Sequence, residues 1–332
     1  MMQTKSAPET FIQELDAQLN AQPPVVVLLG NSVAKEAIDR PYLSAGLSLE
    51  RDQARSIVIG GSSAGHWYAT LRTRIFEKGY RPKVVIVYSP FSQWRTDSGV
   101  PVGADLATLI SLAETDDPVL QEKIFSDDIV AWKVAQLAQR RTRVRNRIIN
   151  SWNHGLVGYA LGSEKQGTVV ARGRQVVEDA QQEMGQKRRE GGGGALLIVE
   201  DADTKPAPVL GRAGSQMGDQ QIDIQSTILP ELISLCRSYG ARVVLVSPPI
   251  RPSDQVPDRF AVYDQLMTEA VAAGADILDM RRVILPNEAF ATMHHLVPSM
   301  RKQMTEQLTM ALKENGLDQA ADSSASRWVK VE

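Results

Sequence analysis

Two distant segments of this 332-residue chain carry side chains whose chemistry could be coupled. A Gly-Asn-Ser tripeptide ending at Ser32 directly follows the apolar run at residues 25–29, and His294 and His295 lie near the C-terminus. A serine hydroxyl becomes a nucleophile when a histidine ring nitrogen takes its proton. If the fold brings Ser32 and His295 together, the pair could cleave or transfer an ester.

The position of Ser32 between an apolar run and a helical pattern predicts a strand-to-helix turn. In a parallel α/β sheet such a turn lies at the carboxyl edge, where ligands bind. The backbone N–H groups of Ser32 and Gly61, which follows a second apolar run, could then stabilise an oxyanion. Plainer roles stay open, since serine is a common N-cap and a Gly-Gly pair often forms a tight turn.

The motifs resemble those of the SGNH (GDSL-type) hydrolases. Residues 30–32 match the first block of that family, usually Gly-Asp-Ser, and residues 59–62 resemble the second block, whose glycine offers a backbone N–H. Phe290 and His295 fall on the Phe-x-Asp-x-x-His pattern, in which Thr292 occupies the Asp position. The third block, usually Gly-x-Asn, is replaced by Ser-Pro-Phe-Ser-Gln.

The resemblance covers residues 22–95 and 225–315. It implies a serine-dependent acyl-ester hydrolase or O-acyltransferase that needs no cofactor or metal and that acts on a small-molecule or carbohydrate ester. Ser32 would be the nucleophile and His295 the general base, with His294 as the neighbouring alternative. The carbohydrate assignment rests on family analogy and a few aromatic residues.

In a catalytic triad, an acidic residue orients the histidine that activates the serine. The chain departs from the SGNH family at this acidic residue, where it has Thr292. A threonine hydroxyl does not stabilise an imidazolium as a carboxylate does. Thr292 or a backbone carbonyl could orient the ring, or Glu288 or Asp279 could replace the carboxylate. A third outcome is loss of catalysis, which would leave a non-catalytic SGNH-like protein that binds glycans or partners. A phosphate-binding Gly-Asn-Ser turn in an unrelated α/β protein is a further alternative.

Further side chains are expected around the mouth of the site. Ser89 is the candidate to replace the missing Asn of the oxyanion hole, with Ser92 and Gln93 as alternatives. His66 and Trp67 follow the second block and could contact substrate, as could Arg251 after the fourth strand. Burial for packing, or a surface ion pair in the case of the arginine, is the competing interpretation of these residues.

The hydrophobic pattern predicts a three-layer, doubly wound α/β fold with a parallel sheet of about five strands. Near-continuous apolar runs indicate strands that are covered on both faces. The predicted strands are residues 25–29, 56–60, 83–88, 242–247 and 276–280, and the predicted helices of the sheet domain are residues 10–20, 65–78, 228–239, 260–273 and 299–315.

The chain is expected to divide into a discontinuous α/β domain and an insertion. Residues 1–95 and 223–318 would form the sheet domain, 96–222 a mostly helical insertion that could bind a partner protein, and 319–332 a loose polar tail. A short strand is also expected at residues 195–200.

Composition narrows the functional classes. A net charge of −2 gives no reason to expect nucleic acid or an anionic membrane as a partner. Cys236 is the only cysteine, which excludes an intrachain disulfide and a cysteine-based zinc site. The sequence shows neither an apolar membrane span nor a signal peptide. We therefore expect a cytoplasmic protein, with an excised domain of an envelope-associated protein as the alternative.

Overall fold

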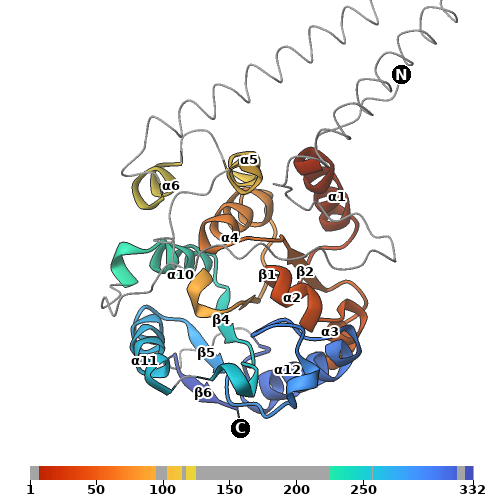
Figure 1. Ribbon diagram of the computed structural model, residues 1–332. Helices are drawn as coiled ribbons and strands as arrows, with labels where there is room; N and C mark the ends of the chain where they lie inside the picture. The colour runs from red at the N-terminus through yellow and green to blue at the C-terminus, as the bar shows by residue number, and fades with distance from the viewer. Residues whose placement is uncertain are drawn as a thin grey trace, which may run out of the picture.

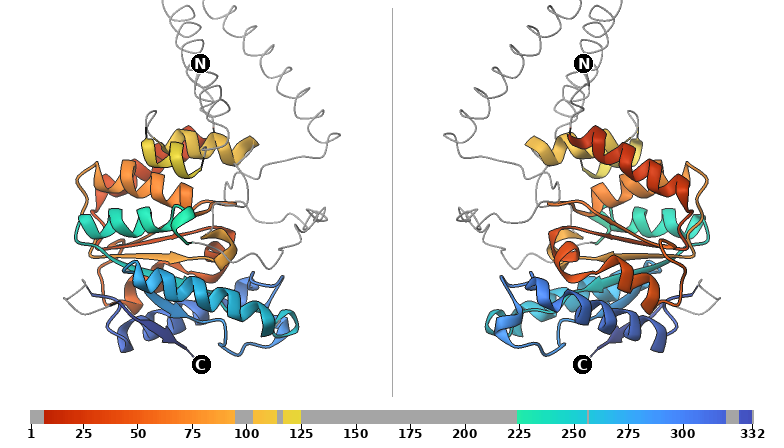
Figure 2. Two further views of the ribbon diagram at one scale, coloured as in Figure 1. Left: turned by 90° about the vertical axis from the view of Figure 1, so that its left-hand side faces the viewer. Right: turned by 90° about the vertical axis from the view of Figure 1, so that its right-hand side faces the viewer.

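The computed structural model describes residues 7–94, 103–113, 117–124, 224–255, 257–319 and 326–331. These residues form an α/β fold in which helices cover both faces of a six-stranded parallel sheet (Figures 1 and 2).

The strands follow the order β2-β1-β3-β4-β5-β6, and every neighbouring pair is parallel. Their bounds are β1 Val26–Gly30, β2 Ala54–Val58, β3 Val84–Tyr88, β4 Arg242–Ser247, β5 Asp276–Asp279 and β6 Trp328–Lys330. Strand β1 is buried along its whole length, as its unbroken apolar sequence predicts for a strand covered on both faces. Its last residue, Gly30, pairs with Val58 of β2 and Tyr88 of β3.

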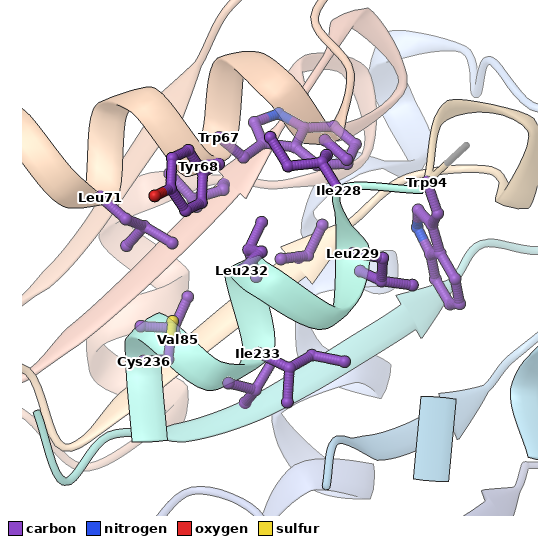
Figure 3. Packing of buried hydrophobic residues seen from close by; sticks show 14 of the residues in the cluster. Trp67, Tyr68, Leu71, Val85, Trp94, Ile228, Leu229, Leu232, Ile233 and Cys236 are labelled. Carbon is purple, nitrogen blue, oxygen red and sulfur yellow. The ribbon is translucent and has the colours of Figure 1, made fainter. Parts of the chain in front are cut away.

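One face of the sheet packs against a hydrophobic cluster that includes Val27 and Leu29 of β1. The helices that contribute to it are α1 Ala7–Ala21, α4 Ala64–Thr70 with its continuation as a π-helix at Leu71–Phe76, α5 Gly103–Leu112, α6 Pro118–Lys123, α10 Leu229–Ser238 and α11 Pro257–Ala272. Figure 3 shows part of this cluster, to which Trp67 of α4 and Leu229, Leu232 and Ile233 of α10 contribute.

The opposite face packs against a second cluster that includes Val26 and Leu28. Its helices are α2 Ser32–Ala37, α3 Arg40–Gly46 and α12 Arg301–Glu314. Phe290 and Leu296, on either side of the histidine pair, are buried in the same cluster. The chain also forms short 3-10 turns at Phe91–Gln93, Ile224–Ser226, Pro252–Asp254, Asn287–Ala289 and Pro298–Met300.

The predicted strands of the sheet domain are all present, with ends that differ by at most two residues. The expected number of strands was too low by one, because Trp328–Lys330 lies in the segment taken for a loose tail and pairs with β5. Three residues in a polar context carry little strand signal, so only the long-range pairing reveals β6.

The predicted helical insertion, residues 96–222, falls within the described residues only at its N-terminal end. Helices α5 and α6 contribute Leu109, Leu112 and Leu120 to the same cluster as the sheet, so this part shares the core of the α/β fold. Residues 125–223, including the strand expected at 195–200, lie outside the described residues. Within the part of the chain that is described, no helix is both long and apolar enough to cross a membrane.

Candidate active site

The Ser32 hydroxyl and the His295 ring are in hydrogen-bond contact, with 3.0 Å between Ser32 Oγ and His295 Nε2. Ser32 is the first residue of α2, directly beyond the carboxyl end of β1, and His295 lies in the loop that precedes α12. The expected approach of these two side chains, which are 263 positions apart, is thus confirmed. A distance of 3.0 Å lies within the range in which a general base can accept a proton.

The other nitrogen of the His295 ring contacts Thr292, with 2.7 Å between Nδ1 and the Thr292 Oγ1 atom. A hydroxyl can either accept a hydrogen bond from Nδ1–H or donate one to an unprotonated Nδ1. If Nδ1 is the donor, Nε2 is unprotonated and can accept the proton of Ser32. In the opposite tautomer Nε2 donates to the serine. A carboxylate would favour the first arrangement, whereas Thr292 permits both.

The loop that carries His295 is closed by backbone hydrogen bonds. Phe290 and Leu296 form an isolated antiparallel bridge, and Ala291 N donates to His295 O at 2.7 Å. The buried side chains of Phe290 and Leu296 anchor the two ends of the loop, while Thr292 at its tip is exposed. The loop is therefore fixed at its base and solvated where Thr292 meets the ring.

The turn before Ser32 is held by hydrogen bonds of Asn31, one to the backbone of α2 and one to Ser89, the residue directly after β3. Asn31 is the N-cap of α2, and its side-chain oxygen accepts from Val33 N at 3.0 Å. Its side-chain Nδ2 donates to Ser89 Oγ at 3.1 Å. A Cβ at Gly30 would lie 2.2 Å from the Ala34 Cβ atom and 2.8 Å from the Tyr88 carbonyl oxygen. Only glycine lets α2 approach the end of β1 this closely.

The glycine expected in the oxyanion hole lies in a turn beside this one. Ser62 N donates to Ile59 O at 3.1 Å, which closes a turn in which Gly61 has a φ of 72°. Ile59 N donates to the Gly30 carbonyl at 3.0 Å, so the turn sits next to the residues that precede Ser32. Gly61 is exposed, which leaves its backbone open to a ligand.

Ser89 was the candidate donor to the oxyanion, but its side chain is fully buried. A side chain that donates a hydrogen bond to a substrate has to be exposed in the site. The Ser89 hydroxyl accepts from Asn31 and lies 3.5 Å from the Pro90 carbonyl oxygen, to which it donates. These contacts support the turn before Ser32. The alternatives Ser92 and Gln93 are partly exposed.

The expectation that His66 and Trp67 line the mouth of the site conflicts with their burial. They are 2% and 0% exposed, because the first turn of α4 packs into the cluster on its side of the sheet. His66 Nδ1 accepts from Ser63 N at 3.4 Å, and the Trp67 indole donates to Ser62 Oγ at 2.9 Å. Neither ring is open to a substrate in this structure.

Arg251 belongs to a loop that lies against the histidine loop, and its side chain is engaged in an ion pair. Its backbone N–H donates to Met293 O at 2.9 Å, and its Nε lies 2.5 Å from Asp254 Oδ2. The ion-pair interpretation left open from the sequence therefore describes its observed contact.

His294 turns toward the same loop, with 3.4 Å between its Nδ1 and the Pro249 carbonyl oxygen. Burial lowers the pKa of His294, and the neighbouring His295 lowers it further, against the opposite effects of the Pro249 carbonyl and Asp254. Of the two adjacent histidines, His295 is the one whose ring is in contact with Ser32 in the described residues.

The carboxylates considered as substitutes for the missing acid have other positions. Asp279 is buried and binds Arg281 through both oxygens, at 2.8 Å and 2.7 Å. Glu288 is exposed in the 3-10 turn Asn287–Ala289. The side chain in contact with His295 Nδ1 is thus Thr292, and neither carboxylate.

Two supporting groups were missed in the sequence, namely the Ser62 hydroxyl and the Asn31 amide. Serine directly after Gly-Gly, and Asn in place of Asp in the first block, were visible signals. Their partners are Ser89, directly after β3, and Trp67 of α4, however, and no local pattern reveals those. Among the described residues, no group of three or more His, Cys, Asp or Glu side chains could hold a metal ion.

Comparison with known proteins assigns no family. No family model and no curated protein matches the chain. Among solved structures, the chain is similar to LAE5, an alpha/beta hydrolase enzyme from the metagenome of Lake Arreo, Spain, with 11% identity, coverage of 89% of this chain and 96% of that chain, and a TM-score of 0.35.

Proposed function

We propose that this protein is a serine-dependent acyl-ester hydrolase or O-acyltransferase of the SGNH type. The observation that supports the proposal is the 3.0 Å contact between Ser32 Oγ and His295 Nε2 beyond the carboxyl end of β1. Open parallel sheets bind their ligands at this edge.

In the proposed reaction, Ser32 Oγ attacks the carbonyl carbon of an ester while His295 Nε2 takes the hydroxyl proton. The negative charge that develops on the carbonyl oxygen is stabilised by the backbone N–H groups of Ser32 and Gly61. The C–O bond to the leaving group then breaks, and His295 returns the proton to the departing alkoxide. The product is an acyl-enzyme on Ser32.

The second half of the reaction decides between hydrolysis and transfer. Water or an acceptor hydroxyl gives its proton to His295 and attacks the acyl-enzyme, which regenerates the Ser32 hydroxyl. We propose an acylated carbohydrate as the substrate on the basis of the resemblance to the SGNH family. Since Thr292 gives no charge stabilisation to the imidazolium, we expect a slow reaction by the standards of complete triads.

The experiment is covalent labelling with a fluorophosphonate probe, followed by peptide mapping. Wild-type protein should be labelled at Ser32, and Ser32→Ala should remove the label. Ser238→Ala is the matched control, because this exposed serine donates to Leu235 O on α10, away from the site. In parallel, His295→Ala should slow the acylation burst with p-nitrophenyl acetate by at least about 10²-fold.

The second candidate function is non-catalytic binding of a glycan or a partner protein through the same edge of the sheet. It is favoured by one observation, the neutral hydroxyl at the position of the triad acid. A wild-type protein that is inert to probes and esters, yet binds a glycan saturably even as Ser32→Ala, would establish this function instead.

A further inference from the structure

A chain of buried hydrogen bonds joins helix α4 to the residue two positions before Ser32. The Trp67 indole Nε1 donates to Ser62 Oγ at 2.9 Å, and Ser62 Oγ donates to the Gly30 carbonyl oxygen at 3.0 Å. Both side chains are 0% exposed. Because bulk solvent does not reach these side chains, each depends on its protein partner for a hydrogen bond.

The indole fixes the direction of the serine proton. An indole N–H can only donate, so Ser62 Oγ must accept from Trp67 and its own proton is left for Gly30 O. A fully satisfied buried network of this kind restricts each member to one geometry. Trp67 thus determines how Ser62 binds Gly30.

Ser62 also defines the turn that carries Gly61. Its backbone N–H closes this turn on Ile59 O, while its side chain binds Gly30 O, which Ile59 N contacts as well at 3.0 Å. The turn is therefore attached to the end of β1 at both of its ends. These attachments set the position of the Gly61 backbone relative to Ser32.

We propose that Ser62 and Trp67 are positioning residues that hold the Gly61 N–H at the oxyanion formed during attack by Ser32. This inference rests on the proposed function. Misplacement of a catalytic group by about 1 Å can lower a rate about 10²-fold. The donor acts only once the oxyanion forms, so its misplacement should affect the acylation step and not the binding of the ester.

The test is Ser62→Ala, measured by the acylation burst with p-nitrophenyl acetate. We expect the acylation rate constant to fall by about 10-fold to 10²-fold, which is less than the about 10²-fold to 10³-fold cost of losing an oxyanion donor, because the Gly61 N–H is displaced and not removed. The apparent binding constant of the ester should stay within about threefold, and the pH midpoint of acylation should not move, because His295 keeps its contacts. Trp67→Phe, which keeps an aromatic ring but removes the indole donor, should cause a smaller fall of the same kind.

The matched control is Thr70→Val. It also removes a fully buried hydroxyl, in this case from the C-terminal end of α4. That hydroxyl donates to His66 O at 2.8 Å. If Ser62 has a purely structural role, Ser62→Ala and Thr70→Val should lower the acylation rate constant per folded molecule by the same factor. That result would overturn the inference. If Ser62→Ala does not fold, Trp67→Phe with wild-type acylation overturns it equally. An inert wild type would instead refute the proposed function and this inference with it.

Discussion

The two halves of the candidate site are supported in different ways. On the Ser32 side, the turn rests on Asn31, Ser62 and Ser89, which are buried side chains with hydrogen bonds to neighbouring strands and helices. On the His295 side, the ring is oriented by Thr292, which is exposed to solvent. The proposed nucleophile is held by buried side chains, whereas the ring of the proposed base contacts one solvated, neutral hydroxyl.

This difference follows from where the two loops leave the sheet. Strand β1 lies between β2 and β3, so the turn at its end has neighbours on both sides. The loop of His295 follows the 3-10 turn Asn287–Ala289, is anchored at its base by Phe290 and Leu296, and contacts the loop after β4 through the bond from Arg251 N to Met293 O. We infer that substitutions on the Ser32 side act on stability and geometry together, and that substitutions at Thr292 act mainly on chemistry.

The largest effect is expected from Gly30→Ala. The new methyl group would overlap the Ala34 side chain and the Tyr88 carbonyl, so α2 would have to move away from β1. Overpacking of this kind costs typically 1–3 kcal/mol and sometimes more, and we expect about 3 kcal/mol here. Urea unfolding measures this loss of stability as a lower urea concentration at the midpoint, with an unchanged dependence of the free energy of unfolding on urea.

The control for Gly30→Ala is Gly60→Ala. A Cβ at Gly60 would meet no heavy atom within 4 Å, so the free energy of unfolding should stay close to that of the wild type. Equal destabilisation by both substitutions would show that the close approach of α2 to β1 does not restrict position 30.

The next effect in size concerns the His295 side. Thr292→Asp places a carboxylate beside His295 Nδ1, where it would select the productive tautomer and stabilise the imidazolium. Because loss of a triad Asp can cost about 10⁴-fold, even partial restoration should raise the acylation rate at least about 10-fold. Burst kinetics with p-nitrophenyl acetate measure this change.

Two companion variants sharpen that result. Thr292→Ser keeps the hydroxyl and should retain most of the wild-type rate, whereas Thr292→Val keeps the shape and should lower it. If Thr292→Val acylates as fast as the wild type, the 2.7 Å contact has no role in orienting the ring.

The sequence was sufficient for the parts of this site that depend on local pattern. Five strands followed from continuous apolar runs, and the Ser32–His295 pair followed from a strand-turn-helix motif and a resemblance. The burial of side chains in the segments that follow the strands could not be predicted in the same way. His66 and Trp67 have side chains that could bind a substrate, and they follow a glycine turn. The orientation of α4 nevertheless buries both of them.

The same limit explains β6 and the supporting hydrogen bonds. Trp328–Lys330 becomes a strand because β5 offers a free edge, which is a property of the assembled sheet. The contact between Asn31 and Ser89 spans 58 positions, and that between Ser62 and Gly30 spans 32. Single-sequence patterns extend over about one element, so such partners appear only in three dimensions.

A moderate effect is expected at Asn31. Asn31→Ala removes both the N-cap acceptor of α2 and the donor to Ser89, and loss of an N-cap typically costs about 1 kcal/mol. Asn31→Asp keeps the cap oxygen, and the Ser89 hydroxyl can rotate to donate to the new carboxylate. Urea unfolding should therefore rank stability as wild type, then Asn31→Asp, then Asn31→Ala. Equal stability of all three would show that the cap contributes nothing at this turn.

The smallest effect concerns the pH dependence of stability through His294. Burial holds the pKa of His294 in the folded state below its ordinary value of 6.5, so protonation favours the unfolded chain. The contribution of the neutral, buried His294 ring to the free energy of unfolding is fully present above pH 6.5. It is lost as the pH falls through the lowered pKa of the folded state. His294→Asn keeps a donor that can reach Pro249 O but cannot titrate. The free energy of unfolding, measured by urea between pH 7.5 and 5.5, should therefore fall less steeply in His294→Asn than in the wild type. Parallel pH profiles would mean that His294 is as well solvated in the folded protein as in the unfolded chain, and that the loop against Pro249 opens readily on the exposed side of the site.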